Sequence, residues 1–271
     1  MKNNIGIMQG RLVDREIKSR LQSFPWRYWR KEIKLANKNK IKFLEWTLDY
    51  NKFDYNPLIK HPKKVLKYLK LNKVQVKTVT ADFFMQKPPF LTHNKTSDYL
   101  KKLIEIANIV GIKYIIVPLV DNSSIKKKYK ERQILDYFKS LKINTKFKKV
   151  KILFELDLPP QKLLKFINKL NKSFGINYDI GNSVSYGYKF EDEKKYFHRV
   201  LNVHIKDRKI NSRSVPLGKG DVEFSKFFLF LKKIKYSGLL ILQTYIPKGK
   251  LALKNTLKNY KFVKKFYEKE K

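Results

Sequence analysis

Four polar residues stand near the ends of four separate short apolar runs in the second half of the chain: Glu155, Asp179, His204 and Gln243. Each run is typical of a buried strand. A carboxylate at the end of such a strand is costly unless a partner offsets its desolvation, and a bound cation is one such partner. On successive parallel strands the four side chains converge on one rim of a barrel, where barrel enzymes keep their chemistry.

The elements that must position these residues repeat along the whole chain. Eight apolar runs typical of strands occur, and most of the segments between them are lysine-rich with helical periodicity. The runs are Asn4–Met8, Phe43–Trp46, Val74–Thr80, Tyr114–Leu119, Ile152–Leu156, Ile176–Ile180, Leu201–Ile205 and Leu239–Thr244. Eightfold alternation predicts an α/β fold, a single (β/α)8 TIM barrel. The alternative is an open doubly wound sheet, but no GxGxxG loop follows the first run.

The chain has 271 residues, which suits one barrel domain over residues 1–271 without linker or second domain. Among the predicted helices, one places Leu103, Ile106, Ala107 and Val110 on a common face. Another has Phe227, Phe228, Leu231 and Ile234 on its apolar face, and a last helix covers Lys254–Glu268. The first loop is long, from Gly10 to about Pro25, and Ser23 is a plausible N-cap of the helix that follows.

Composition narrows the class of protein. There is no cysteine, so disulfides and thiolate metal ligands are excluded. No window of 18 apolar residues occurs, and the N-terminus lacks the pattern of a signal peptide. We therefore expect a cytoplasmic protein with no membrane partner.

The net charge of +39 suits a polyanion partner at first sight. Only nine of the 62 basic residues are arginine, however, and the lysines lie on nearly every predicted helix. Lysine, asparagine, isoleucine, tyrosine and phenylalanine are all plentiful and all have A/T-rich codons, so a biased genome explains them together. We expect no specific nucleic-acid partner, with a true polyanion surface as the alternative.

Several motifs together resemble the xylose-isomerase-like barrels, which include sugar phosphate isomerases and epimerases. They are Gly6–Leu12, Glu45-Trp46, Val117–Asn122, Phe154-Glu155, Asn177–Asn182 and His204–Asp207. The resemblance runs nearly from end to end of the chain. One fold hosts many activities, so the motifs indicate the superfamily more strongly than the substrate.

The resemblance implies one divalent metal ion (Mn, Mg, Co or Zn) bound by Glu155, Asp179, His204 and Gln243. The family usually has glutamate at the last of these positions. Glutamine can lend a carbonyl oxygen to a hard cation but cannot take a proton. Epimerisation by two symmetric carboxylates is therefore not expected. Asn182 is a second departure, since many family members have a substrate-facing histidine there.

The activity implied is isomerisation or epimerisation of a small sugar or sugar phosphate. A proton next to a carbonyl is removed, and the metal stabilises the resulting enediolate. Glu155 is the best candidate for the catalytic base, because Gln243 cannot act as one. The acid that returns the proton is open between Lys206, Asp207 and a metal-bound water.

Other residues are candidates for substrate binding: Gln9, Arg11, Glu45, Trp46, Asn122, Asn182, Lys206 and Arg208. Arginine is scarce here, so the two arginines suggest bidentate binding of an anion, with surface salt bridges as the alternative and Asp207 as a possible partner of Arg208. Trp46 fits a pocket wall and core packing equally. The Gly218–Asp221 segment reads either as a backbone nest for an anion or as a turn in which Asp221 caps the next helix.

Two other functions remain open. Gln243 and Asn182 also suit a barrel that binds a ligand without turnover. An abasic-site endonuclease shares this barrel, but its multinuclear zinc cluster needs several histidines. The chain has four, of which His204 is the strand-end residue and His93 the other rim candidate, while His61 and His198 lie elsewhere. Barrels of this type often pair, so a homodimer is one expected state.

Overall fold

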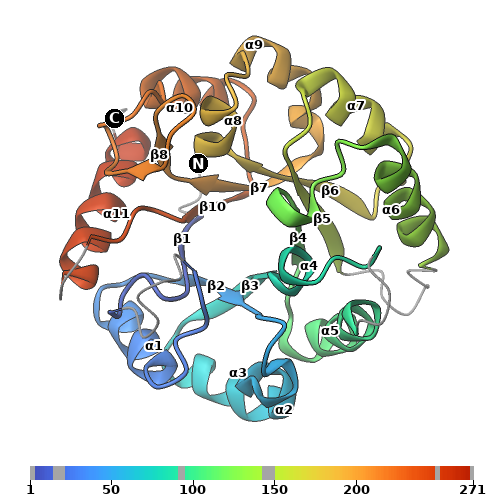
Figure 1. The fold of residues 1–271 in the computed structure, drawn as a ribbon. Helices are drawn as coiled ribbons and strands as arrows, with labels where there is room; N and C mark the ends of the chain where they lie inside the picture. The colour runs from blue at the N-terminus through green and yellow to red at the C-terminus, as the bar shows by residue number, and fades with distance from the viewer. Residues whose placement is uncertain (1–3, 15–21, 91–94, 142–149, 248–250, 269–271) are drawn as a thin grey trace.

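The computed structural model describes residues 4–14, 22–90, 95–141, 150–247 and 251–268. Eight parallel strands close into a barrel in the order β1-β10-β7-β6-β5-β4-β3-β2, which confirms the predicted fold (Figure 1). The strands are β1 (Ile5–Met8), β2 (Phe43–Thr47), β3 (Gln75–Thr80), β4 (Tyr114–Leu119), β5 (Lys151–Leu156), β6 (Phe174–Asp179), β7 (Val200–Ile205) and β10 (Leu239–Leu242). A small antiparallel pair, β8 (Asp207–Arg208) and β9 (Ser214–Val215), follows β7.

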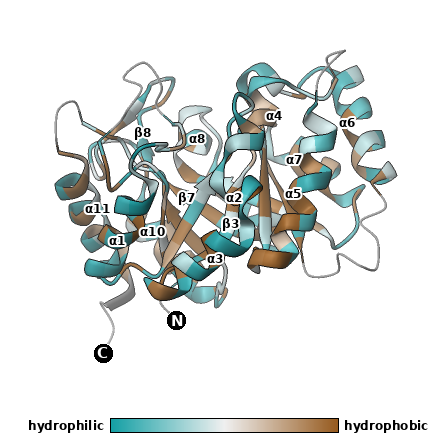
Figure 2. Ribbon diagram, turned by 90° about the horizontal axis from the view of Figure 1, so that it is seen from below, coloured by the Kyte–Doolittle hydropathy of each residue, from teal (hydrophilic) through white to brown (hydrophobic). Residues whose placement is uncertain are grey.

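The longer helices surround the barrel in a ring, and some of the short helices lie nearer its centre in this view (Figure 1). They are α1 (Trp29–Lys38), α2 (Pro57–Lys60), α3 (Pro62–Leu71), α4 (Phe83–Gln86), α5 (Thr96–Val110), α6 (Lys128–Ser140), α7 (Pro160–Asn168), α8 (Ile180–Ser185), α9 (Phe190–Glu193), α10 (Phe224–Lys233) and α11 (Ala252–Glu268). Figure 2 shows hydrophobic strands inside and hydrophilic outer helix surfaces. Within the described ranges, no helix is both long and apolar enough to cross a membrane.

The predicted apolar helix faces pack against the barrel. In α5 the buried residues include Leu103, Ile106, Ala107 and Val110. In α10 the two central phenylalanines and Leu231 are buried, but Ile234 comes after the helix and is 41% exposed. Apolar stripes at helical spacing therefore identify the barrel-facing surface, and burial of about 1.5 to 3 kcal/mol per large side chain holds the helices there.

The segment before α1 differs from the prediction. The helix begins at Trp29 with Tyr28 as its N-cap, so the prediction that Ser23 caps it is wrong. Phe24 is buried and its ring packs against Trp26 at 5.0 Å and Trp46 at 5.3 Å between centroids. Aromatic contacts rather than a cap therefore direct the chain into α1. Residues 15–21 of the predicted long loop lie outside the described residues.

Parallel pairing fixes which side chains meet at the rim. Asp179 of β6 is in register with His204 of β7, and His204 is in register with Ile241 of β10. All eight strands run the same way, so their carboxyl ends meet at the same end of the barrel. The residues at those strand ends are thus brought together from segments far apart in sequence.

Candidate active site

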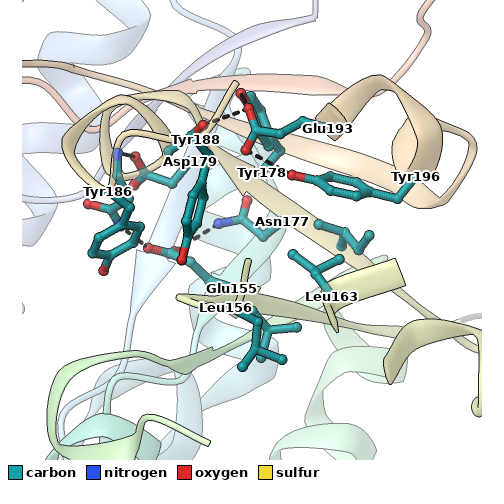
Figure 3. Close-up of a pocket in the computed structure, with 14 residues that line it drawn as sticks. Glu155, Leu156, Leu163, Asn177, Tyr178, Asp179, Tyr186, Tyr188, Glu193 and Tyr196 are labelled. Carbon is teal, nitrogen blue, oxygen red and sulfur yellow. Dashed lines mark hydrogen bonds between the residues drawn. The ribbon is translucent and has the colours of Figure 1, made fainter. Parts of the chain in front are cut away.

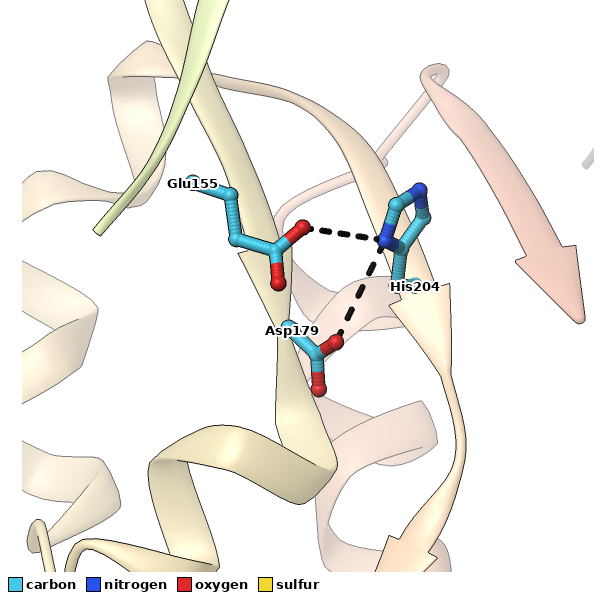
Figure 4. A group of neighbouring side chains, drawn as sticks. All are labelled: Glu155, Asp179 and His204. Carbon is cyan, nitrogen blue, oxygen red and sulfur yellow. Dashed lines mark ion pairs between the residues drawn. The ribbon is translucent and has the colours of Figure 1, made fainter. Parts of the chain in front are cut away.

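Three of the four strand-end residues form one buried group (Figure 4). Glu155 Oε2 lies 3.2 Å from His204 Nδ1, and Asp179 Oδ2 lies 4.0 Å from the same nitrogen. One ligand atom from each residue lies within 4.8 Å of the others. The three side chains come from β5, β6 and β7, as their positions in the sequence predict.

The orientation of His204 is set by a carboxylate on the opposite side of the barrel. His204 Nε2 lies 2.8 Å from Glu45 Oε1, and Glu45 also accepts a hydrogen bond from Thr80 Oγ1 at 2.7 Å. Pairing Nε2 with a carboxylate leaves Nδ1 facing Glu155 and Asp179, the usual arrangement behind a metal-binding histidine. Burial alone would lower the pKa of His204, but in the absence of a cation Glu45 and Glu155 outweigh it and raise the pKa to about 10. A divalent ion bound to Nδ1 would take the place of the proton on that nitrogen. The structure places Glu45, predicted to bind substrate, fully buried behind His204.

Glu155 is held by two asparagine amides. Asn177 Nδ2 donates to Glu155 Oε2 at 2.9 Å, and Asn182 Nδ2 donates to Oε1 at 2.9 Å. Burial would raise the pKa of Glu155, but His204 and Lys206 together with the Asn177 amide lower it below its ordinary value. These contacts favour the ionised form of the carboxylate.

Asp179 offers one oxygen to the group. Its Oδ1 accepts the backbone N–H of Asn182 at 2.8 Å and so caps α8. Its Oδ2 makes no hydrogen bond within the described residues and is instead ion-paired with Lys206 Nζ at 2.7 Å. Two buried carboxylates and an imidazole are a donor set that fits a divalent cation, although in this structure the Lys206 ammonium contacts Oδ2. Burial chiefly raises the pKa of Asp179, and Lys206 opposes that rise.

Gln243 lies beside this group, but its side-chain amide forms hydrogen bonds with other residues. Its Oε1 accepts from Lys206 Nζ at 3.0 Å, and its Nε2 donates to Gln22 Oε1 at 2.9 Å. Gln22 in turn donates to Asp82 Oδ2 at 2.6 Å. Burial and the neighbouring Asp49 raise the pKa of Asp82 well above its ordinary value. The side-chain oxygen of Gln243, which was predicted to be the fourth metal ligand, is therefore bonded to the Lys206 ammonium in this structure.

The other predicted binding residues lie in different surroundings. Gln9 is buried, with Oε1 accepting from Thr47 N at 3.1 Å and Nε2 without a partner among the described residues. Arg11 is also buried, and its Nε donates to the Thr244 carbonyl at 3.1 Å. Asn122 is exposed in the short 3₁₀ helix after β4.

Trp46 does not line the site. It is fully buried, its indole N–H donates to Asn56 Oδ1 at 3.0 Å, and its ring packs against Phe24 and Trp29. Neighbouring strand residues point to opposite faces, so Trp46 faces the helices when Glu45 faces the barrel. Core packing is the correct interpretation, and the pocket-wall interpretation is wrong.

The segment after β8 is organised by Asp207. Its Oδ2 accepts the backbone N–H groups of Gly218 at 2.8 Å and Gly220 at 2.9 Å. The predicted nest thus binds an anion, but the anion is the protein's own carboxylate. Asp221 accepts from Ile210 N and does not cap α10, whose N-cap is Glu223, so the capping interpretation is wrong.

Arg208 does not pair with Asp207. Its Nη1 donates to Asn182 Oδ1 at 2.7 Å, and its Nε donates to the Ser212 carbonyl at 2.8 Å. Asn182 therefore joins Arg208 to Glu155. Because Asp207 is fully buried and saturated by backbone donors, it is a poor candidate for the returning acid.

A small pocket opens beside the group (Figure 3). Glu155, Asp179 and Asn182 line one part of it, and Tyr186 and Tyr188 line another. At its far end Glu193 accepts hydroxyl hydrogen bonds from residues that also line the pocket: Tyr178 at 2.7 Å, Ser183 at 2.6 Å and Tyr196 at 3.0 Å. The sequence interpretation did not identify these tyrosines.

The histidines do not form a second metal site in the described part of the chain. His204 is the histidine in the metal-competent group, while His61 precedes α3 and His198 lies in the 3₁₀ helix before β7. The prediction for His93 lies outside the described residues. This histidine count gives no support to a multinuclear zinc cluster.

The fold and this rim site define a xylose isomerase-like TIM barrel. A family model with that description matches residues 33–266, and the chain belongs to this family. A Haemophilus influenzae protein named "Putative L-ribulose-5-phosphate 3-epimerase SgbU" is 29% identical over 104 residues, which cover 35% of this chain and 36% of that protein.

Solved structures share the fold across nearly the whole chain. The IOLI protein with a bound zinc atom has a TM-score of 0.73 at 18% identity, over 89% of this chain and 94% of that one. A xylose isomerase-like TIM barrel protein from Mycobacterium smegmatis in complex with magnesium has a TM-score of 0.67 at 13% identity, over 95% and 94%. At these identities the likeness is one of fold.

Proposed function

We propose that the protein is an isomerase or epimerase that acts on a small sugar or sugar phosphate by removing a proton next to a carbonyl. The observation that carries this proposal is the buried group of Glu155, Asp179 and His204 at the rim of a barrel of this family. The epimerase name of the partial relative supports the same class of reaction. Glu155, Asp179 and His204 would hold one divalent metal ion.

In this proposal Glu155 is the base. Its pKa is lowered and its two oxygens are fixed by the Asn177 and Asn182 amides, so the carboxylate is ionised and oriented before substrate enters. A bound divalent ion would act as a Lewis acid that stabilises negative charge on substrate oxygens. The tyrosines of the adjacent pocket provide an amphipathic wall of the kind that small-molecule sites use.

Lys206 is the best remaining group for returning the proton. Its ammonium lies beside Asp179 and Gln243, and its side chain is 12% exposed, so it reaches the open side of the site. Asp207 is occupied by backbone donors, and Gln243 cannot exchange a proton in this way. Base and acid are then chemically different groups, in contrast to a symmetric pair of carboxylates.

The test is proton exchange in D₂O with a panel of ketoses and their phosphates, after incubation of the protein with Mn²⁺. We expect solvent deuterium to enter the substrate carbon next to the carbonyl, and Glu155→Gln to reduce this exchange by at least about a hundredfold. Glu105→Gln, on the exposed side of α5, is the matched control. Exchange that persists at full rate in Glu155→Gln would exclude Glu155 as the base. No exchange on any substrate, with metal bound, would favour a ligand-binding barrel.

A further inference from the structure

The ammonium group of Lys206 lies inside the carboxylate group. Lys206 Nζ is 2.7 Å from Asp179 Oδ2 and donates to Gln243 Oε1 at 3.0 Å. Asp179 Oδ2 is also the oxygen that lies 4.0 Å from His204 Nδ1. A cation bound by Asp179 and His204 would therefore use the oxygen that Lys206 already contacts.

Two local features let Lys206 reach this position. A Cβ atom on Gly181 would lie 2.5 Å from Lys206 Cγ, so the missing side chain leaves room for the lysine stem. Gln243 is turned by its amide contact with Gln22 at 2.9 Å, which leaves its carbonyl facing the ammonium. Because the Gln243 amide is neutral, Asp179 supplies the negative charge in this contact.

Binding of Lys206 and of a divalent ion to Asp179 Oδ2 at the same time is unfavourable. Asp179 is buried, and like charges in a buried site are poorly screened by solvent and salt. An ammonium 2.7 Å from Oδ2 also occupies space next to the oxygen that a metal ion would need.

We propose that Lys206 is a built-in cation that competes with the divalent metal ion for Asp179, so that metal binds only when the ammonium has moved off Oδ2. This inference rests on the metal site of the proposed function. It adds a link between metal binding and the position of Lys206, because the ammonium and the metal ion would use the same oxygen of Asp179. Gln243 has a defined part in it, as the neutral group that holds the lysine without replacing Asp179.

The test is Mn²⁺ binding to the full chain, stripped of metal with a chelator and titrated by calorimetry at neutral pH. Lys206→Met should bind Mn²⁺ roughly tenfold more tightly than the wild type, which is a typical coupling between two competing ligands. Lys209→Met, an exposed lysine three residues along, should leave the affinity unchanged.

Equal or weaker Mn²⁺ binding by Lys206→Met would overturn the competition while leaving the metal site intact. Failure of every protein, wild type included, to bind Mn²⁺ would overturn the metal site and the competition together. A second measurement needs no variant: labelling of lysines by an amine reagent, read peptide by peptide in a mass spectrometer. Labelling of Lys206 should rise when Mn²⁺ is added while that of Lys209 stays constant, and an unchanged Lys206 signal would overturn the proposal.

Discussion

Glu32 is a buried carboxylate that holds the turn after β1. Its Oε2 accepts the backbone N–H of Gly10 at 3.0 Å, and its Oε1 accepts those of Arg11 and Leu12, each at 3.0 Å. The turn carries Arg11, whose side chain is bonded to the Thr244 carbonyl next to β10. Glu32 therefore helps to join the first and last strands at the rim where the candidate site lies.

Burial raises the pKa of Glu32 from its ordinary value of 4.5 to about 7, although the three N–H groups and Arg11 oppose the rise. Because the folded state binds the proton more tightly than the unfolded state, the contribution of Glu32 to stability is fully present below pH 4.5. It is lost as the pH rises through about 7. A shift of this size corresponds to roughly 3 kcal/mol of unfolding free energy.

Glu32→Gln removes this titration. The glutamine keeps one acceptor oxygen but places its NH₂ group against a backbone N–H, much as the protonated acid places its hydroxyl there. We therefore expect the variant to lose roughly 1 to 2 kcal/mol of unfolding free energy relative to the wild type at low pH. As the pH rises from about 5 to about 8, the variant should gain roughly 3 kcal/mol relative to the wild type and become the more stable protein.

The assay is urea unfolding followed by tryptophan fluorescence at a series of pH values, with the unfolding free energy of variant and wild type compared at each. Glu105→Gln, on the exposed side of α5, serves as control and should show no such trend. A difference between Glu32→Gln and wild type that stays constant over this pH range would refute the reasoning, because Glu32 would then titrate alike in the folded and unfolded states.

Three further changes test the site and the barrel. His204→Ala leaves the fully buried Glu45 without its partner at 2.8 Å, so the unfolding free energy should fall by roughly 3 to 5 kcal/mol in urea titrations. The Glu45→Gln, His204→Ala double variant should recover part of that loss, and no recovery would mean that the pair is not the cause. Gln243→Glu adds a carboxylate beside Lys206, and calorimetry should find Mn²⁺ binding several-fold tighter; unchanged binding would exclude the missing carboxylate as a limit on metal affinity. Gly6→Ala places a Cβ atom 2.7 Å from Ile241 Cδ1 and 2.9 Å from Phe43 Cβ, so thermal unfolding should occur several degrees lower, at a cost of about 1 to 3 kcal/mol. An unaltered melting temperature would show that β1 and its neighbours can shift without strain.

The barrel could be predicted from sequence because its strands and helices leave periodic patterns. The predicted strand Ile152–Leu156 differs from β5 by one residue at its start, and the predicted helix Lys254–Glu268 differs from α11 by two. Closure into a barrel follows from the number of strand and helix units. The same reasoning locates Glu155, Asp179 and His204, because strand ends of a parallel sheet share one rim.

Strand alternation could have improved the prediction of the site. Glu45 and Trp46 are neighbours on one strand and must face opposite sides, so they could not both line the barrel. Asn177 lies two residues before Asp179 and therefore on the same face, where it donates to Glu155. The missed asparagine was thus accessible to the same rule that excludes Trp46.

Contacts between distant side chains could not be predicted in this way. Gln22 meets Gln243, which is 221 residues further along the chain, and it also meets Asp82. Neither contact corresponds to a periodic pattern in the sequence, because each depends on the conformations that two side chains adopt after the barrel has closed. The ion pair between Lys206 and Asp179 likewise depends on side-chain conformations in the closed barrel, where Gly181 leaves room for the lysine stem.

A polar layer inside the barrel supports the site from below. Asn202 Nδ2 donates to Asn177 Oδ1 at 2.7 Å, Asn177 donates to Glu155, and Glu45 pairs with His204. These groups are costly to bury, and apolar residues would fill the space at lower cost. Their hydrogen bonds to one another offset part of that cost. They also restrict the conformations open to the Glu155 carboxylate and the His204 imidazole. Stability alone gives no reason for this layer, whereas the proposed roles of Glu155 and His204 require a carboxylate and an imidazole that are held in place.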